Sequence, residues 1–175
     1  MVLAAVQNRW NSFLLLAAAL LGVALAVPAA DAYRLAGKGA PDFALKGTSG
    51  VNFRLSEYRG DVVALAFWGS RCGTCGDQLG ALSRMVNTYQ SAGLTVLAVN
   101  VDDDQGAAAA FAAVHPVAFP VLLDPTKSVA KAYRVDNLPM LLLIDRGGAI
   151  RYVHRNYRSG SDAQYLDQIR VLLDE

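Results

Sequence analysis

Apolar residues are concentrated in two runs, 62–68 and 94–101, which contain few polar positions. Runs of this kind are typical of central parallel strands that are covered on both faces. Between them, apolar residues recur at spacings of three and four, which predicts an amphipathic helix that reaches about Gln90 and ends near Gly93. Because strand–helix–strand units cross over right-handed, we expect the two strands to be parallel neighbours or near neighbours. The pattern predicts an α/β fold.

Shorter elements are predicted on both sides of this unit. The turn-rich segment 47–50 separates two short apolar stretches, 43–45 and 51–55, which is typical of a β-hairpin. Gly147 and Gly148 predict a second hairpin turn. The remaining predictions, in chain order, are a helix at 106–114, a strand at 119–123, a short helix at 124–133, strands at 140–144 and 149–156, and a closing amphipathic helix at 162–173.

Three acidic residues, Asp102, Asp103 and Asp104, precede the predicted helix at 106–114. Acidic side chains at this place commonly cap the helix and face its positive end. A metal site is the alternative, and we favour capping.

The first 32 residues differ in composition from the rest. A basic start is followed by an apolar stretch at 13–27, by Pro28, and by the small-residue pattern Ala30-Asp31-Ala32. These features predict a secretory signal peptide at 1–32 and a folded domain at 33–175. A retained membrane anchor is the alternative, because the apolar stretch approaches the ~17–25 residues needed to span a bilayer. Both interpretations place the domain outside the cytoplasm.

Composition and charge narrow the possible partners. The chain is 54% hydrophobic and 18% charged, with a formal net charge of +1. Such a composition is typical of a globular domain. The charge gives no electrostatic basis for binding nucleic acid or an acidic substrate.

The only two cysteines, Cys72 and Cys75, lie between the run 62–68 and the predicted helix. The first N–H groups of a helix have no partners within it, and together with the helix dipole they should stabilise a thiolate at Cys72. A thiol pKa lowered from ~8.5 to ~7 raises the thiolate fraction at neutral pH from a few per cent to about half. A second thiol one helical turn further on can then close a disulfide. The pair is therefore predicted to be a redox site.

Two other interpretations of the pair were weighed against this one. A zinc site usually needs four ligands, but the chain has no second cysteine pair and its two histidines, His115 and His154, stand alone. A structural disulfide is the second alternative, although a bridge that closes so short a loop constrains the unfolded chain little. A Cys-x-x-Cys pair in a βαβ context favours redox chemistry.

Four segments share a recognisable order and spacing. They are VVALAFWGSRCGTC at 62–75, APDFAL at 40–45, LSEYRGD at 55–61 and NLPMLLLID at 137–145. Together they resemble the thioredoxin-like thiol–disulfide oxidoreductases, and more narrowly the exported TlpA-like group of bacteria. The resemblance extends from about Gly37 to the C-terminus. It implies a three-layer α/β/α fold with a central mixed sheet, an N-terminal β-hairpin, and an inserted strand and helix after the second βα unit.

The resemblance also implies a reaction, thiol–disulfide exchange, that needs no metal or organic cofactor. Cys72 would attack a substrate disulfide, and Cys75 would resolve the mixed disulfide and leave the pair oxidised. Gly73 and Thr74 would set the turn between them and its electrostatics.

Three further residues are expected to support the pair. By the same resemblance, Trp68 should pack beside the cysteines. Pro139 should follow a cis peptide bond and face them, and the backbone of Leu138 should offer hydrogen bonds to a substrate chain.

Several positions depart from the family pattern. Arg71 stands where tryptophan is common, and a cation there should favour the neighbouring thiolate. Thr74 replaces a common proline, so no reduction potential can be copied from a relative. Ala66 and Gln78 stand where many relatives carry a buried Asp and a Glu, so the second cysteine lacks a familiar proton acceptor. Asp77 or water is left as a substitute.

The leading functional hypothesis is an exported reductase that supplies electrons to oxidised cysteines of other exported proteins. It would act as a monomer in the periplasm or on the extracytoplasmic face of a bacterial membrane, with a membrane electron donor. Family members serve cytochrome c maturation, assembly of copper sites or rescue of oxidised proteins, and the sequence does not choose among these roles. An oxidase or isomerase with the same site is the nearest alternative.

Two more distant alternatives were considered. A peroxiredoxin-type peroxidase would need Thr or Ser three residues before its reactive cysteine, where this chain has Gly69. A copper-binding assembly factor would need His154 to approach the two cysteines, which in that family are usually three rather than two residues apart.

Overall fold

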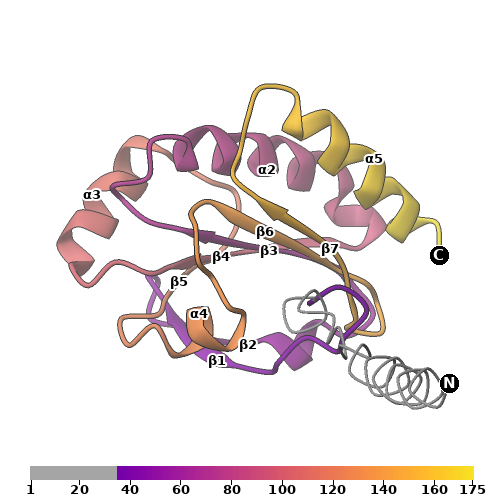
Figure 1. The fold of residues 1–175 in the computed structure, drawn as a ribbon, viewed down its shortest axis with the longest axis horizontal. Helices are drawn as coiled ribbons and strands as arrows, with labels where there is room; N and C mark the ends of the chain where they lie inside the picture. The colour runs from indigo at the N-terminus through magenta and orange to yellow at the C-terminus, as the bar shows by residue number, and fades with distance from the viewer. Residues whose placement is uncertain (1–34) are drawn as a thin grey trace, which may run out of the picture. The chain divides into compact units, whose positions relative to one another are not determined.

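A seven-stranded mixed β-sheet forms the centre of the domain (Figure 1). The structure, a computed structural model, describes residues 35–175. The predicted signal peptide at 1–32 lies outside these residues, and among those described no helix has both the length and the apolar character needed to cross a membrane.

The strands follow the order β2-β1-β5-β4-β3-β6-β7 across the sheet. Their bounds are β1 Ala44–Gly47, β2 Asn52–Arg54, β3 Val62–Trp68, β4 Leu94–Asn100, β5 Val121–Leu123, β6 Met140–Ile144 and β7 Ile150–Arg155. Both predicted hairpins are confirmed, because β1 pairs antiparallel with β2 and β6 pairs antiparallel with β7.

The α-helices are α2 Cys75–Tyr89, α3 Gln105–Val114, α4 Ser128–Ala132 and α5 Ser161–Leu173. Two short 3-10 helices, η2 Leu55–Tyr58 and η3 Gln90–Ala92, complete the described elements. The left-handed backbone of Gly93, with a φ of 97°, ends the helical segment that began with α2. Glycine adopts such a φ without the steric cost that a Cβ would bring.

Strand β3 lies in the interior of the sheet, between β4 and β6. It lies parallel to β4, from Val62 opposite Leu94 to Trp68 opposite Asn100, and antiparallel to β6 on its other side. Every residue of β3 is buried, as expected of a central strand whose two faces are both covered. These pairings bring the carboxyl ends of β3 and β4 and the amino end of β6 to one edge of the sheet.

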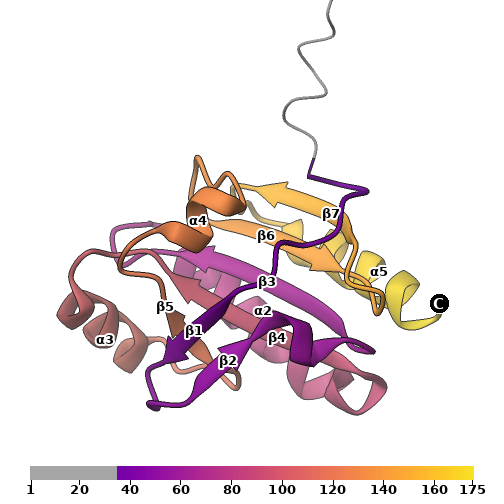
Figure 2. The ribbon, with the colours of Figure 1, turned by 90° about the horizontal axis from the view of Figure 1, so that it is seen from below.

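Helices cover both faces of this sheet and make the three layers that the resemblance implies (Figures 1 and 2). The side chains of Val62, Ala64, Ala66 and Trp68 share one apolar cluster with residues of α2, α3 and α5. The alternate side chains, Val63, Leu65 and Phe67, share a second cluster with residues of α4 and η2. This alternation follows from the two-residue period of a β-strand.

Most predicted boundaries shift by one or two residues, and three of the differences have a clear physical reason. Helix α2 begins at Cys75, so Cys72 precedes it instead of occupying its N-terminus. Strand β5 begins at Val121, after Pro120, whose ring removes a backbone donor. Helix α4 is only five residues long, because the predicted segment begins with a turn in which the N–H of Lys127 donates to the carbonyl of Asp124 at 3.0 Å. The carboxylate of Asp124 then accepts the N–H of Ala130, within the helix, at 2.8 Å.

The capping role predicted for the acidic triplet belongs to Asp104. Its Oδ1 accepts hydrogen bonds from the N–H groups of Gly106 at 2.8 Å and Ala107 at 3.3 Å, at the start of α3. Asp103 is exposed and pairs with Lys127 at 2.9 Å, whereas Asp102 faces the cysteine loop.

We predict that Asp104→Ala lowers the free energy of unfolding by about 1 kcal/mol, because two N–H groups at the start of α3 lose their acceptor. Chemical denaturation measures this change. Asp104→Ser is the matched control, since serine is also a good capping residue, and it should stay within about 0.5 kcal/mol of the original protein. Equal losses in both variants would contradict the capping role.

Candidate active site

The cysteine pair lies in a tight loop between β3 and α2. The N–H of Cys72 donates to the carbonyl of Gly69 at 3.1 Å, and the N–H of Cys75 donates to the carbonyl of Cys72 at 3.3 Å. Cys72 and Cys75 are joined by a disulfide, with their Cα atoms 5.4 Å apart. The short separation follows from these two turn hydrogen bonds.

The two sulfur-bearing residues have different surroundings. Cys75 is the first residue of α2 and is 0% exposed, within the apolar cluster beneath the helix. Cys72 lies outside the helix, is partly exposed and packs against the edge of the same cluster. The sequence placed Cys75 deeper in the helix than Cys72; in the structure the difference lies in burial, and both residues are at or before the first turn.

A carboxylate holds the loop that leads to Cys72. Oδ2 of Asp102 accepts the N–H of Ser70 at 2.8 Å and the side-chain amide of Asn100 at 2.9 Å. The amide oxygen of Asn100 in turn accepts the N–H of Asp102 at 3.1 Å. These bonds fix the end of β4 to the first residues after β3.

Gly69 is enclosed where these segments meet. A Cβ added there would lie 3.1 Å from Oδ1 of Asp102 and 3.1 Å from Cδ1 of Leu138. Both distances are closer than ordinary van der Waals contact, so a larger residue would push apart the loops that flank Cys72.

The structure places the predicted supporting residues around this loop. Trp68 is 1% exposed, belongs to the same cluster as Cys75, and stacks on Phe111 of α3 with ring centroids 4.9 Å apart. The peptide bond between Leu138 and Pro139 is cis, as the resemblance implies. Within residues 35–175, neither backbone group of Leu138 takes part in a backbone hydrogen bond, and the role expected of them in holding a substrate chain stays a prediction.

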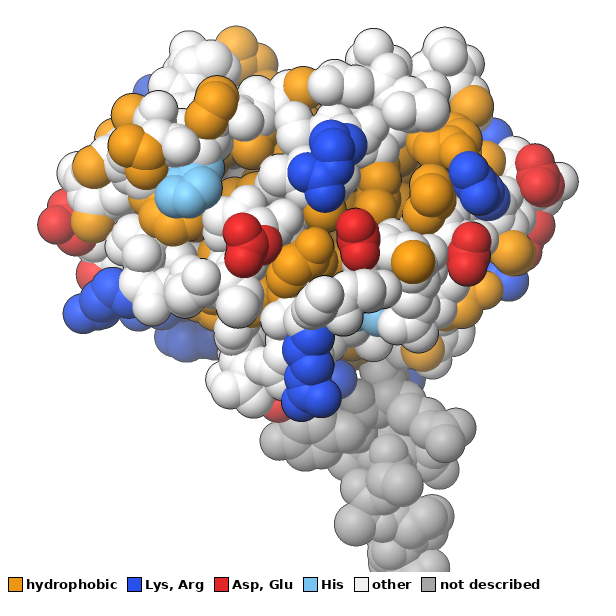
Figure 3. All heavy atoms as spheres, turned by 90° about the horizontal axis from the view of Figure 1, so that it is seen from above, with side chains coloured by type: hydrophobic (Ala, Val, Ile, Leu, Met, Phe, Trp, Pro, Cys, Tyr) orange, Lys and Arg blue, Asp and Glu red, His pale blue; other side chains and the backbone are white. Residues whose placement is uncertain are grey.

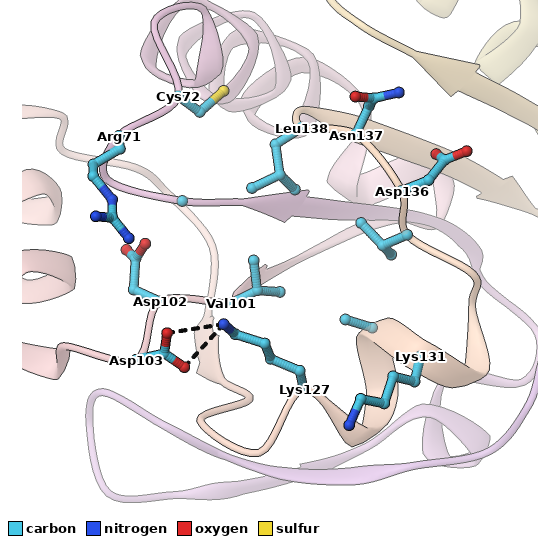
Figure 4. Close-up of a pocket in the computed structure, with 13 residues that line it drawn as sticks. Arg71, Cys72, Val101, Asp102, Asp103, Lys127, Lys131, Asp136, Asn137 and Leu138 are labelled. Carbon is cyan, nitrogen blue, oxygen red and sulfur yellow. Dashed lines mark hydrogen bonds and ion pairs between the residues drawn. The ribbon is translucent and has the colours of Figure 1, made fainter.

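Arg71 and the two residues between the cysteines are exposed. In Figure 4 the guanidinium of Arg71 is directed toward the carboxylate of Asp102 and away from the sulfur of Cys72. A Cβ on Gly73 would meet no atom within 4 Å, and Thr74 precedes the first residue of α2 without capping it through its side chain. The roles assigned to these three residues stay predictions.

An open cavity of about 630 Å³ adjoins Cys72 (Figure 4). Its walls come from the cysteine loop, the end of β4, helix α4 and the segment before Pro139. The lining residues are Gly69, Arg71, Cys72, Val101, Asp102, Asp103, Lys127, Ala130, Lys131, Val135, Asp136, Asn137 and Leu138. The cavity is therefore lined by both the more exposed cysteine and Leu138.

The two histidines have distinct surroundings. His115 lies against the first turn of α2, where a Cβ on Gly76 would be 2.5 Å from its Nε2, and its ring stacks on Phe111. Nε2 of His154 is 2.6 Å from Oε1 of Gln168, and its ring packs on Tyr165. Burial lowers the pKa of His154.

Across residues 35–175 no group of three or more His, Cys, Asp or Glu side chains could hold a metal ion.

Sequence reasoning missed Asp102 as part of the site, because the acidic triplet was interpreted as a helix cap. A signal was present: Asp102 directly follows a parallel strand, and the carboxyl ends of parallel strands meet at one edge of the sheet, where sites in α/β proteins form. The missing information was the register that puts Asn100 beside Trp68.

Comparison with known proteins agrees with this geometry. Residues 36–153 match the AhpC/TSA family. The chain is 33% identical over 135 residues to a thiol-disulfide oxidoreductase ResA of Geobacillus kaustophilus, covering 77% of this chain and 78% of that protein. Against ResA of Bacillus subtilis it is 35% identical, over 65% of this chain and 64% of that one.

Solved structures show the same fold. A candidate thiol:disulfide interchange protein DsbE of Chlorobium tepidum superposes with a TM-score of 0.76 at 37% identity, covering 79% of this chain and 97% of that one. A candidate protein disulfide isomerase of Bacteroides thetaiotaomicron gives 0.74 at 30% identity, covering 80% and 91%.

The fold and the Cys72–Cys75 pair define a thioredoxin-like thiol–disulfide oxidoreductase, an enzyme whose substrates are thiol-containing proteins. The chain belongs to the AhpC/TSA family.

We predict that Cys72→Ser abolishes disulfide exchange, whereas Cys75→Ser forms the mixed disulfide with a substrate but cannot release it. The reason is that only Cys72 borders the cavity, while Cys75 is buried behind it. Non-reducing electrophoresis and mass spectrometry detect the trapped species. Turnover of Cys75→Ser at the original rate would contradict these roles.

We also predict that Asp102→Ala slows disulfide exchange about tenfold, because the loop before Cys72 loses the acceptor that orients it. Asp102→Asn keeps an acceptor oxygen and removes the charge, so it should stay within about threefold of the original rate. Asp103→Ala, a neighbour in the same cavity, serves as a control. Rate constants for reduction of a peptide disulfide show whether Asp102→Ala is slower than Asp102→Asn. Equal rates in the two variants would contradict the prediction.

Proposed function

We propose that the protein is an exported reductase that transfers electrons from its Cys72–Cys75 dithiol to disulfides of other exported proteins. One observation carries the proposal: the partly exposed Cys72 opens into a cavity, while its partner is fully buried. This asymmetry suits a reaction in which a substrate disulfide meets one sulfur first and the second sulfur later releases the substrate.

The shape and chemistry of the cavity favour a polypeptide as substrate. Leu138 lines the same cavity as Cys72, and among residues 35–175 its N–H and C=O make no backbone hydrogen bond, so an extended chain could pair with them. The cavity is open and its charges are mixed, with Arg71, Lys127 and Lys131 facing Asp102, Asp103 and Asp136. Three of these six already have partners: Lys127 pairs with Asp103, and Asp136 pairs with Arg155, which lies outside the lining.

One face of the molecule offers no basic surface for a polyanion. On the face shown in Figure 3, acidic and basic side chains are interspersed and do not gather into a patch of one sign. The formal net charge of +1 agrees with this distribution. Nucleic acid would require a concentrated basic surface.

Export rests on the predicted signal peptide, and the direction of the reaction rests on the resemblance. The predicted signal peptide at 1–32 would deliver the domain to a compartment where disulfides persist, so the pair would need electrons from a membrane donor. The second candidate function is that of an oxidase or isomerase that uses the same cysteine pair. It is favoured by the 30% identity to the candidate isomerase of Bacteroides thetaiotaomicron.

The reduction potential of the pair distinguishes the two candidates. We predict a value near −270 mV, as low as that of thioredoxin, when the purified domain is equilibrated with glutathione buffers. Such a potential makes the dithiol a donor of electrons to most substrate disulfides. A value near −120 mV would contradict the proposal and make the protein an oxidant of substrate thiols.

A further inference from the structure

Gln78 is a buried polar residue three positions after Cys75 of the redox pair. It lies in the first turn of α2 and is 0% exposed, and it is the one amide on the buried face of that helix. Its Nε2 donates to the hydroxyl of Tyr165 at 3.1 Å, a contact that joins α2 to α5. Its Oε1 is buried and has no hydrogen-bond partner among residues 35–175. A buried acceptor without a donor is costly, so its retention calls for a physical explanation.

Cys75, three residues before Gln78 on the same helix, can supply a donor. Residues three apart on a helix are neighbours, with about 5–6 Å between their Cβ atoms, and Cys75 and Gln78 both belong to the buried face of α2. In the structure Cys75 is bonded to Cys72 and carries no proton. Its sulfur becomes a donor only when the disulfide is reduced.

The distribution of unpaired groups agrees with this dependence on redox state. Among the described residues, the buried side-chain nitrogens and oxygens without partners are Trp68 Nε1, Gln78 Oε1 and Arg155 Nη2. Two of the three flank the cysteine pair, one at the end of β3 and one in the first turn of α2. In the disulfide form, two buried polar atoms near the cysteines thus lack hydrogen-bond partners.

We propose that Oε1 of Gln78 accepts the thiol hydrogen of Cys75 in the reduced protein, which makes Gln78 a positioning residue that stabilises the dithiol form. Reduction breaks the S–S bond, and two electrons come from a dithiol of a partner protein. Two protons are taken up when both sulfurs become thiols, or one when Cys72 stays a thiolate. In each case a proton resides on Cys75 and points at Gln78.

A carboxylate at position 78 could both accept a hydrogen bond from Cys75 and take its proton, whereas Gln78 can only accept the hydrogen bond. An amide accepts a hydrogen bond but cannot take the proton itself. Gln78 therefore favours the protonated form of Cys75, and the proton must leave by another route before Cys75 attacks the mixed disulfide. The inference rests on the same redox pair as the proposed function but not on the direction in which the pair works.

The central test is Gln78→Met, which keeps the length and apolar volume of the side chain and removes the acceptor oxygen. We expect the equilibrium constant for reduction of the pair by glutathione to fall about tenfold, which corresponds to ~30 mV toward more negative potential. Gln90→Met makes the same change on an exposed side chain just after the last residue of α2 and should leave the equilibrium constant unchanged.

A second readout follows the proton directly. In the Cys72→Ser background, the thiolate absorbance of Cys75 gives the pKa of its thiol. Because a hydrogen bond to the neutral thiol disfavours ionisation, Gln78→Met should lower that pKa by about one pH unit. Loss of packing alone would weaken both redox forms and would not shift this pKa.

If Gln78→Met does not fold, Gln78→Glu provides the test, since a carboxyl at this place would add a break to the pH dependence of the potential. An unchanged equilibrium constant in Gln78→Met, or an unbroken pH dependence in Gln78→Glu, would overturn the proposal. A shift between variants with an absolute potential near −120 mV would instead uphold the role of Gln78 and reject the reductase.

Discussion

The close approach of three chain segments at Gly69 is the constraint on which the site depends. Strand β3 is buried along its whole length, and the chain must turn from it into α2 within six residues. Asp102 from the end of β4 and Leu138 from the segment before β6 close on Gly69 from two sides. Since these contacts fix the loop, they also fix Cys72 at the rim of the cavity and Cys75 in the core.

This packing explains how much of the fold could be predicted. Strands β3 and β6 have the predicted bounds, because a run of apolar residues covered on both faces has few alternative positions. The start of α2 was predicted too early, since it depends on turn hydrogen bonds within the loop and not on periodicity. Asp102 was missed for a related reason: its role depends on the register of β4 against β3, which no local pattern encodes.

The electrostatics of the pair come from neutral groups more than from charges. The positions where relatives often carry acidic residues hold Ala66 and Gln78 here, and both are buried. Gln78 is tied to Tyr165, whose own pKa is raised by burial, so no ionised group of this pair stands behind Cys75 at neutral pH. Arg71 is directed toward Asp102 and not toward the sulfur. The side chains at positions 66 and 78 therefore bring no charge to the pair.

Unequal burial of the two sulfurs decides which one meets the substrate. The most direct measurement is the rate at which iodoacetamide alkylates each thiol of the reduced protein at neutral pH, resolved by mass spectrometry of short pulses. The account predicts that Cys72 is modified at least about ten times faster than Cys75, because only the exposed, thiolate-forming sulfur reacts readily. Equal rates, or faster modification of Cys75, would contradict it.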